Sequence, residues 1–133
     1  MAALMEHPTR VLLVEDTPYL RVAFSRLLRL QGFEVMEAND GQDALDCLET
    51  FHPELILTDL MMPVMGGLEL IKRLHGRADT VEIPIVAITA DASDAMEEQV
   101  RLAGAVDLIS KPVDLAELLR RLRNVVPICG ELA

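Results

Sequence analysis

Short apolar runs alternate with longer amphipathic stretches along the chain, five times each. The apolar runs are mostly rich in Val, Ile and Leu and are expected to form strands: Val11–Glu15, Glu34–Ala38, Leu55–Thr58, Ile85–Thr89 and Val106–Ser110. Four of them, Glu34–Ala38 excepted, are too uniformly apolar for a sheet with one face in water. The pattern therefore predicts that these four are central parallel strands, covered on both faces.

The intervening stretches carry the signals of amphipathic helices. The five expected helices start at Thr17-Pro18, after Asp40-Gly41, at Gly67, at Asp94 and at Asp114. Glycines are expected to close the first helix at Gly32 and the third, Gly67–Leu74, at Gly76. The last helix has the strongest signal, with a box-like cap formed by Asp114 and Glu117 and an apolar stripe that runs from Leu115 to Val125.

Strand and helix thus alternate in the order that a doubly wound α/β sheet with right-handed crossovers produces. The 133 residues are 51% hydrophobic and 26% charged, which are the proportions of one compact globular domain. No internal repeat, low-complexity segment or linker divides them. We therefore predict one α/β domain over residues 10–126, between an N-terminal extension of residues 1–9 and a C-terminal tail of residues 127–133.

Charge and cysteine usage narrow the range of partners. With a formal net charge of −10, the chain is not expected to bind nucleic acid directly, because phosphate-backbone binding depends on clustered Lys and Arg. No stretch approaches the roughly 20 apolar residues of a membrane span, and Met1–Arg10 lacks the features of a signal peptide. Cys47 and Cys129 match no metal spacing and suit the free thiols of a reducing compartment. We expect a cytoplasmic protein without membrane contact.

Polar residues stand where four of the strands end. Glu15-Asp16 end the first strand, Asp59 the third, Thr89-Ala90 the fourth and Lys111-Pro112 the fifth. Singly, each has an ordinary explanation as a helix cap, a turn former, a packed strand residue or a solvated charge. In doubly wound folds, however, functional groups gather past the carboxyl ends of the strands. We therefore expect acids, a hydroxyl and a lysine to converge on one pocket.

These residue types fit phosphoryl transfer. Clustered carboxylates repel one another unless a hard cation lies between them, and Mg²⁺ is commonly held by one or two carboxylates, with Mn²⁺ as an alternative ion. Asp59, alone on a central strand, can act as a nucleophile and form an acyl phosphate. Lys111 and Thr89 would then bind the phosphoryl oxygens on the side opposite the metal.

Taken in order, Glu15-Asp16, Asp59 within DLMMPVMGG, Thr89-Ala90 and Lys111-Pro112 resemble the receiver domain of two-component response regulators, the family that includes the chemotaxis regulators. The resemblance covers about Arg10 to Val126. It implies a flavodoxin-like fold in which five helices flank a five-stranded parallel sheet of order 2-1-3-4-5. It also implies a phosphoprotein of a phosphorelay that takes its phosphoryl group from a histidine kinase or a histidine phosphotransfer protein. Such a domain signals to a downstream protein by contact and is not an enzyme proper.

The same resemblance implies a phosphoacceptor and a metal site. Asp59 is the phosphoacceptor and also a metal ligand. Asp16 binds the metal directly, Glu15 binds it through water, and Met61 binds it through its backbone carbonyl.

The resemblance implies a phosphoryl-binding set as well. Lys111 is the cation that binds the phosphoryl group, Thr89 is the switch hydroxyl, and Ala90 lends a backbone N–H. A cis peptide bond is expected between Lys111 and Pro112.

Three positions depart from the family's usual pattern. Glu15 stands where many members have a second Asp, and its longer, equally acidic arm should still support Mg²⁺. Leu108 replaces the usual Tyr or Phe, and Val113 stands where Phe is common after the Lys-Pro pair. The last two bear on how phosphorylation is communicated to partners.

Other functions fit the sequence less well. A Mg²⁺-dependent enzyme of the aspartyl-phosphate phosphatase type usually carries a second acid two residues after its nucleophile, but that position here is Met61, which transfers no protons. A flavin site on the same fold would need a hydroxyl- or glycine-rich loop where Glu15–Pro18 is acidic. A degenerate receiver that serves only as a scaffold would lack a pocket residue, and none is missing.

The end of the sequence bears on output. After Val126 only Pro127–Ala133 remain, so we expect no DNA-binding or catalytic output domain in this chain and an output through protein contact. Two alternatives stay open. The chain is either a stand-alone regulator or one receiver taken from a longer protein such as a hybrid histidine kinase.

Overall fold

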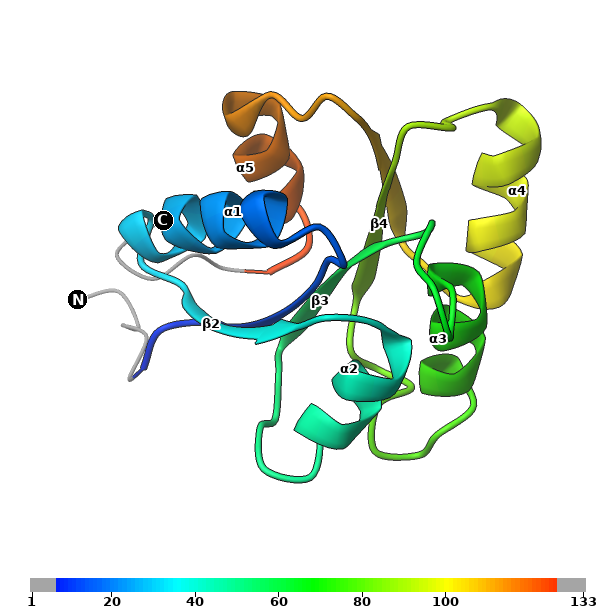
Figure 1. Ribbon diagram of the computed structural model, residues 1–133, viewed down its shortest axis with the longest axis horizontal. Helices are drawn as coiled ribbons and strands as arrows, with labels where there is room; N and C mark the ends of the chain where they lie inside the picture. Colours follow the sequence, from blue (N-terminus) through cyan, green and yellow to red (C-terminus); the bar gives the residue numbers. More distant parts are fainter. Residues whose placement is uncertain (1–6, 127–133) are drawn as a thin grey trace.

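The computed structural model describes residues 7–126, in which strands and helices alternate along the chain. The strands are β1 (Arg10–Val14), β2 (Glu34–Ala38), β3 (Leu55–Asp59), β4 (Ile85–Thr89) and β5 (Asp107–Ser110). The helices are α1 (Pro18–Leu30), α2 (Gly41–Cys47), α3 (Gly67–His75), α4 (Asp94–Ala103) and α5 (Leu115–Arg123). All strand pairs are parallel and follow the order β2-β1-β3-β4-β5 (Figure 1). The predicted flavodoxin-like α/β fold with sheet order 2-1-3-4-5 is confirmed.

The strand ends lie within one residue of the predicted bounds. β1 starts and stops one residue early, β3 extends to Asp59, and β5 begins at Asp107. The predicted apolar stripe of the last helix extends to Val125, but α5 itself ends two residues earlier, at Arg123. Val125 nevertheless packs against the core on that face of the sheet.

The sheet is covered on both faces by helices (Figure 1). Alternate residues of β1 point to opposite sides, since successive side chains of a strand leave opposite faces. Val11 and Leu13 join the core under α1 and α5, whereas Leu12 and Val14 join the core under α2, α3 and α4. Each fully buried aliphatic side chain contributes about 1.5–3 kcal/mol, so these two apolar layers hold the helices to the sheet.

One prediction about the sheet is wrong. β5 is not a central strand but an edge strand, so only β1, β3 and β4 have a neighbour on each side. Leu108 and Ile109 are buried on opposite faces, but Ser110 is exposed. Arg121 of α5 partly covers the edge, where its Nη1 donates to the Asp107 carboxylate and to the Leu108 carbonyl, both at 2.9 Å. The β5 sequence is apolar although it lies at the edge of the sheet, because helices cover both faces of this strand.

The helix caps agree with the sequence only in part. Asp40 caps α2, and its Oδ1 accepts from the Asp43 amide at 2.8 Å. α4 starts at Asp94 as predicted, but its cap is the preceding residue, Ser93, whose Oγ accepts from the Met96 amide. Thr17 occupies the cap position of α1 without a side-chain cap hydrogen bond.

The box-like cap predicted for α5 is also absent. Asp114 occupies the cap position but makes no side-chain cap hydrogen bond. Glu117 does not fold back, because its carboxylate accepts from Arg120 and, at 2.9 Å, from Arg121. The Glu117 side chain therefore points toward Arg120 and Arg121 of the same helix and not toward the backbone at Asp114.

Cys47 is a free, half-buried thiol whose pKa is raised by burial and by the nearby Asp43 and Asp46 carboxylates. Cys129 and the predicted tail lie outside the described residues. Within residues 7–126, no helix has the length and apolar character needed to cross a membrane. The predicted domain boundaries stay predictions.

Candidate metal and phosphoacceptor site

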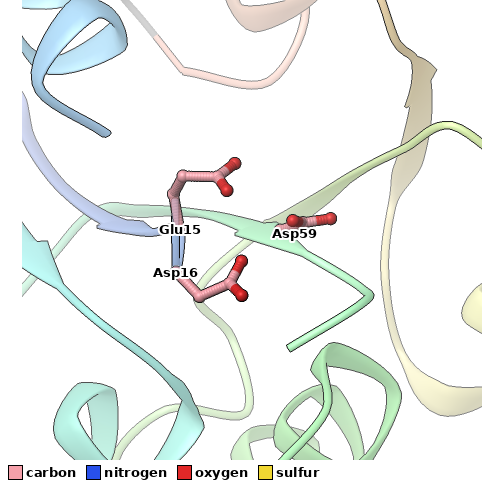
Figure 2. Close-up of side chains that lie close together, drawn as sticks. All are labelled: Glu15, Asp16 and Asp59. Carbon is pink, nitrogen blue, oxygen red and sulfur yellow. The ribbon is translucent and has the colours of Figure 1, made fainter. Parts of the chain in front are cut away.

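Three carboxylates meet where β1 and β3 end. The two strands pair in register, with Val14 opposite Thr58, so the residues that follow Val14 lie beside Asp59. Figure 2 shows the carboxylates of Glu15 and Asp16 on the side that faces Asp59. One oxygen from each of the three groups lies within 4.8 Å of the others. The structure thus brings together three residues that the strand-end rule selected from the sequence.

Asp59 is held in a defined orientation by the backbone that follows it. Its side chain lies at the end of a central strand and only 7% of the residue's surface is exposed. Oδ1 accepts from the Leu60 amide at 2.7 Å and weakly from the Met61 amide at 3.4 Å. With one oxygen bound to the loop, Oδ2 faces the pocket.

Lys111 reaches this pocket from the end of β5. Its Nζ lies 3.2 Å from Asp59 Oδ2 and 3.3 Å from Glu15 Oε1. The Lys111–Pro112 bond is cis, which confirms that prediction. Burial disfavours the ammonium, but the charges of Asp59 and Glu15 outweigh burial and hold the pKa of Lys111 above its ordinary value. Lys111 is therefore a fixed positive charge beside the Asp59 oxygen that faces the pocket.

The surroundings of Glu15 disfavour its ionised form. Burial raises the pKa of Glu15, and the Asp59 charge raises it further, against the opposing effects of the Thr17 amide and Lys111. Three carboxylates facing one ammonium leave two negative charges in the pocket. A hard divalent cation matches both this charge and the all-oxygen donor set, so the residues present fit such an ion.

The other predicted site residues are Thr89, Ala90 and Met61. The buried Thr89 hydroxyl accepts from the Asp91 amide at 3.1 Å, and none of the hydrogen bonds in the described region joins it to Asp59. Ala90 and Lys111 line the same groove. Met61 is 71% exposed, and its amide, rather than its side chain, faces Asp59.

A glycine lets the next helix approach the phosphoacceptor strand. A Cβ atom at Gly67 would lie 2.1 Å from the Asp59 carbonyl oxygen and 2.7 Å from the Leu60 Cα. The Gly67 amide instead donates to the Leu60 carbonyl at 3.0 Å. Only a residue without a side chain fits this close backbone contact.

One residue that contacts the site was not expected from the sequence. Arg21 of α1 donates to the Glu15 carbonyl at 2.9 Å. Because a charged residue on a surface helix ordinarily points to solvent, the helical pattern alone offers no signal for it.

The chain matches a known protein family over most of its length. The family description "Response regulator receiver domain" matches residues 11–123. This chain belongs to that family. It is a receiver domain of two-component signal transduction, a signalling phosphoacceptor rather than a phosphatase-type enzyme, and receiver domains work with histidine kinases.

Curated relatives of two lengths match the chain. Response regulator MprA of Mycolicibacterium vanbaalenii is 38% identical over 121 residues, which cover 90% of this chain and 51% of that protein. The polar-differentiation response regulator DivK of Brucella ovis is 33% identical over 114 residues, which cover 86% of this chain and 93% of that protein. The chain therefore spans about half the length of the first relative and nearly all of the second.

Solved structures agree with the family. Chemotaxis response regulator CheY4 of Vibrio cholerae has a TM-score of 0.84 and 30% identity, covering 90% of this chain and 99% of that one. The receiver domain of the sensor histidine kinase PA1611 from Pseudomonas aeruginosa has a TM-score of 0.81 and 31% identity, covering 89% and 97%. That second structure has a magnesium ion coordinated in its active-site cleft.

Proposed function

We propose that Asp59 accepts a phosphoryl group from the phosphohistidine of a histidine kinase or a histidine phosphotransfer protein. One observation carries the proposal. The Asp59 carboxylate is fixed on its loop side by backbone amides and faces Lys111 and two further acids on the other. In the transfer, an Asp59 oxygen forms a bond to phosphorus while the phosphorus–nitrogen bond breaks, and the electron pair of that bond returns to the imidazole. Phosphorylated Asp59 then alters contact with a downstream protein.

Mg²⁺ is the proposed metal of this site, as in the PA1611 receiver structure, with Mn²⁺ as an alternative ion. Asp16 and Asp59 would bind it directly, Met61 would contribute its backbone carbonyl, and Glu15 would bind through water. When bound, the ion supplies positive charge that offsets both the repulsion among the carboxylates and the negative charge of the incoming phosphoryl group.

Lys111 and Thr89 have the hydrogen-bonding capacity that the proposed roles need. Lys111 already contacts the Asp59 oxygen that faces the pocket, so it is placed to bind a phosphoryl oxygen attached there. The Thr89 hydroxyl accepts from the Asp91 backbone amide, which leaves its own hydrogen free to donate to a phosphoryl oxygen. We assign the remaining phosphoryl contact to the backbone N–H of Ala90.

We propose that the phosphoryl donor docks over α1. An apolar groove of 490 Å³ lies beside Lys111 and Ala90 and is lined by Leu20, Phe24, Pro112 and Val113. The adjacent Tyr19 is exposed on the same helix. A donor bound there would present its histidine at the carboxyl ends of the strands, next to Asp59. We further propose a cytoplasmic location, which the free thiol of Cys47 suits.

The phosphoacceptor assignment is tested with a small-molecule donor. The protein is incubated with acetyl phosphate and Mg²⁺, and its intact mass is measured. We expect the wild type and the control Asp79→Asn, which changes an exposed acid away from the site, to gain one phosphoryl group. We expect no gain in Asp59→Asn and none in the wild type when a chelator removes the metal. A wild type that stays unmodified, or an Asp59→Asn variant that is modified equally, refutes the assignment.

A further inference from the structure

Arg21 joins the end of β1 to β2 through one guanidinium group. Its Nη1 donates to the Glu15 carbonyl at 2.9 Å, and its Nε lies 3.3 Å from Glu37 Oε1. The Arg21 side chain is only 15% exposed, so both contacts are largely shielded from water. Figure 1 shows that α1 follows the end of β1 after a short connection. The Arg21 side chain thus ties α1 to the connection from which it starts.

The carbonyl that Arg21 binds belongs to the peptide group that carries Asp16. Because a peptide group is planar, fixing the Glu15 oxygen also fixes the direction in which the chain enters Asp16. The preceding peptide is held separately, since the Glu15 amide donates to the Ala38 carbonyl at 3.1 Å. Beyond that point the strand ladder has ended, and Arg21 supplies the hydrogen bond that the ladder no longer provides.

We infer that Arg21 is a positioning residue for the metal site. It holds the Glu15–Asp16 peptide so that the Asp16 carboxylate faces Glu15 and Asp59. Groups that orient ligands without touching the metal commonly govern metal affinity, because a freely rotating ligand must be ordered when the ion binds. The inference rests on the proposed function, in which these three carboxylates hold the ion.

The charge of Arg21 would act in the opposite direction. A cation beside the site repels Mg²⁺, so removing its charge alone would tighten Mg²⁺ binding. Glu37 offsets this charge at 3.3 Å and is shared with Arg29, whose Nη1 lies 3.5 Å away. The sign of the change in Mg²⁺ affinity therefore separates positioning from electrostatics.

Arg29 provides the matched control. It lies on the same helix, pairs with the same Glu37 and donates to the Val35 carbonyl of β2 at 2.9 Å. None of its contacts in the described region reaches Glu15. Removing Arg29 weakens the attachment of α1 to β2 but leaves the support of the Glu15–Asp16 peptide in place.

The test uses calorimetry, in which Mg²⁺ alone is titrated into four proteins: the wild type, Arg21→Met, Arg21→Lys and Arg29→Met. We expect the Kd for Mg²⁺ to rise about ten-fold in Arg21→Met and to stay unchanged in Arg29→Met. Arg21→Lys keeps one cationic donor group, so its Kd for Mg²⁺ should lie between the values of the wild type and Arg21→Met. In the metal-free protein, the Asp16 backbone amide resonance should shift in Arg21→Met but not in Arg29→Met.

The outcomes are distinguishable. An unchanged or tighter Kd in Arg21→Met overturns the inference, as does an equal loss in Arg29→Met. If Arg21→Met does not fold, the same criteria apply to Arg21→Lys. A wild type that binds no Mg²⁺ refutes the proposed metal site itself rather than the role of Arg21.

Discussion

At the scale of single residues, Glu15 shows how the site opposes the stability of the fold. It is 2% exposed, and burial together with the Asp59 charge raises its pKa. Ionisation of Glu15 is therefore less favourable in the folded state than in the unfolded chain, and the free energy of unfolding falls as the pH rises from the ordinary pKa of a glutamate through this raised pKa. A cation that binds only the folded protein would offset that loss.

We expect Glu15→Gln to raise the melting temperature of the metal-free protein at pH 7. The amide oxygen can still accept from Thr17. The contact with Lys111 is lost, but the raised pKa of Glu15 means that burial and the Asp59 charge outweigh the contacts that favour the ionised form. Below about pH 4 the wild-type carboxyl is protonated in both the folded and the unfolded state, so the gain should disappear. Circular dichroism melts at both pH values measure the difference.

Glu34→Gln, at an exposed position of β2, is the control and should change little. Mg²⁺ should stabilise the wild type more than Glu15→Gln, because the variant has lost an acidic group of the site. The explanation would be wrong if the metal-free Glu15→Gln protein melted below the wild type at pH 7.

At the scale of elements, the loop from β3 to α3 contains a strained turn next to the phosphoacceptor. Val64 has a φ of 69°, a region that β-branched residues rarely occupy. The Met65 amide donates to the Pro63 carbonyl at 2.7 Å, which closes a γ-turn with Val64 at its centre. The Val64 side chain is 86% exposed, so it makes little packing that would compensate for the strain.

We expect Val64→Gly to stabilise the protein by about 1 kcal/mol, or roughly 4 °C in Tm. Glycine adopts positive φ without a Cβ clash, and this gain exceeds its larger loss of backbone entropy on folding. Val64→Ala retains a Cβ and should recover little of the gain. Thermal unfolding of the three proteins tests the idea, and a Val64→Gly protein that melts below the wild type would argue against a strained turn.

At the scale of the whole molecule, the question is how far phosphorylation of Asp59 is transmitted. In the scheme usual for receivers, the switch hydroxyl moves toward the phosphoryl group and an aromatic residue on the last strand fills the vacated space. Leu108 occupies that position here and is only 6% exposed beneath α4. A hollow of 220 Å³ between α4 and β5 is lined in part by Val100, Ala105 and Leu108. A leucine distinguishes inward from outward positions less than an aromatic ring does, so we expect weak transmission to this face.

Backbone amide shifts with and without beryllofluoride, an acyl-phosphate mimic, test this expectation. Shifts should be large in the loops after β3 and β4 and small along α4 and residues 106–110. Leu108→Tyr should enlarge the changes on the α4–β5 face, because the adjacent hollow can receive a ring. Large wild-type changes at α4 and β5 that persist in Leu108→Ala would show that another side chain carries the switch.

The sequence by itself determined the elements, their alternation and the residues at the strand ends. Burial imposes a period of about two on strands and 3.6 on helices, so these features can be recognised in short windows. The placing of Glu15, Asp16 and Asp59 in one pocket followed from a rule about parallel sheets and did not require coordinates.

Only the tertiary structure decided which atoms meet. Lys111, after β5, contacts both Glu15, after β1, and Asp59 of β3. Arg21 of α1 likewise contacts the Glu15 carbonyl. Local patterns specify which face of an element is apolar, but side-chain rotamers and the packing of elements against one another select hydrogen-bond partners. These non-local choices fix the orientation of the site.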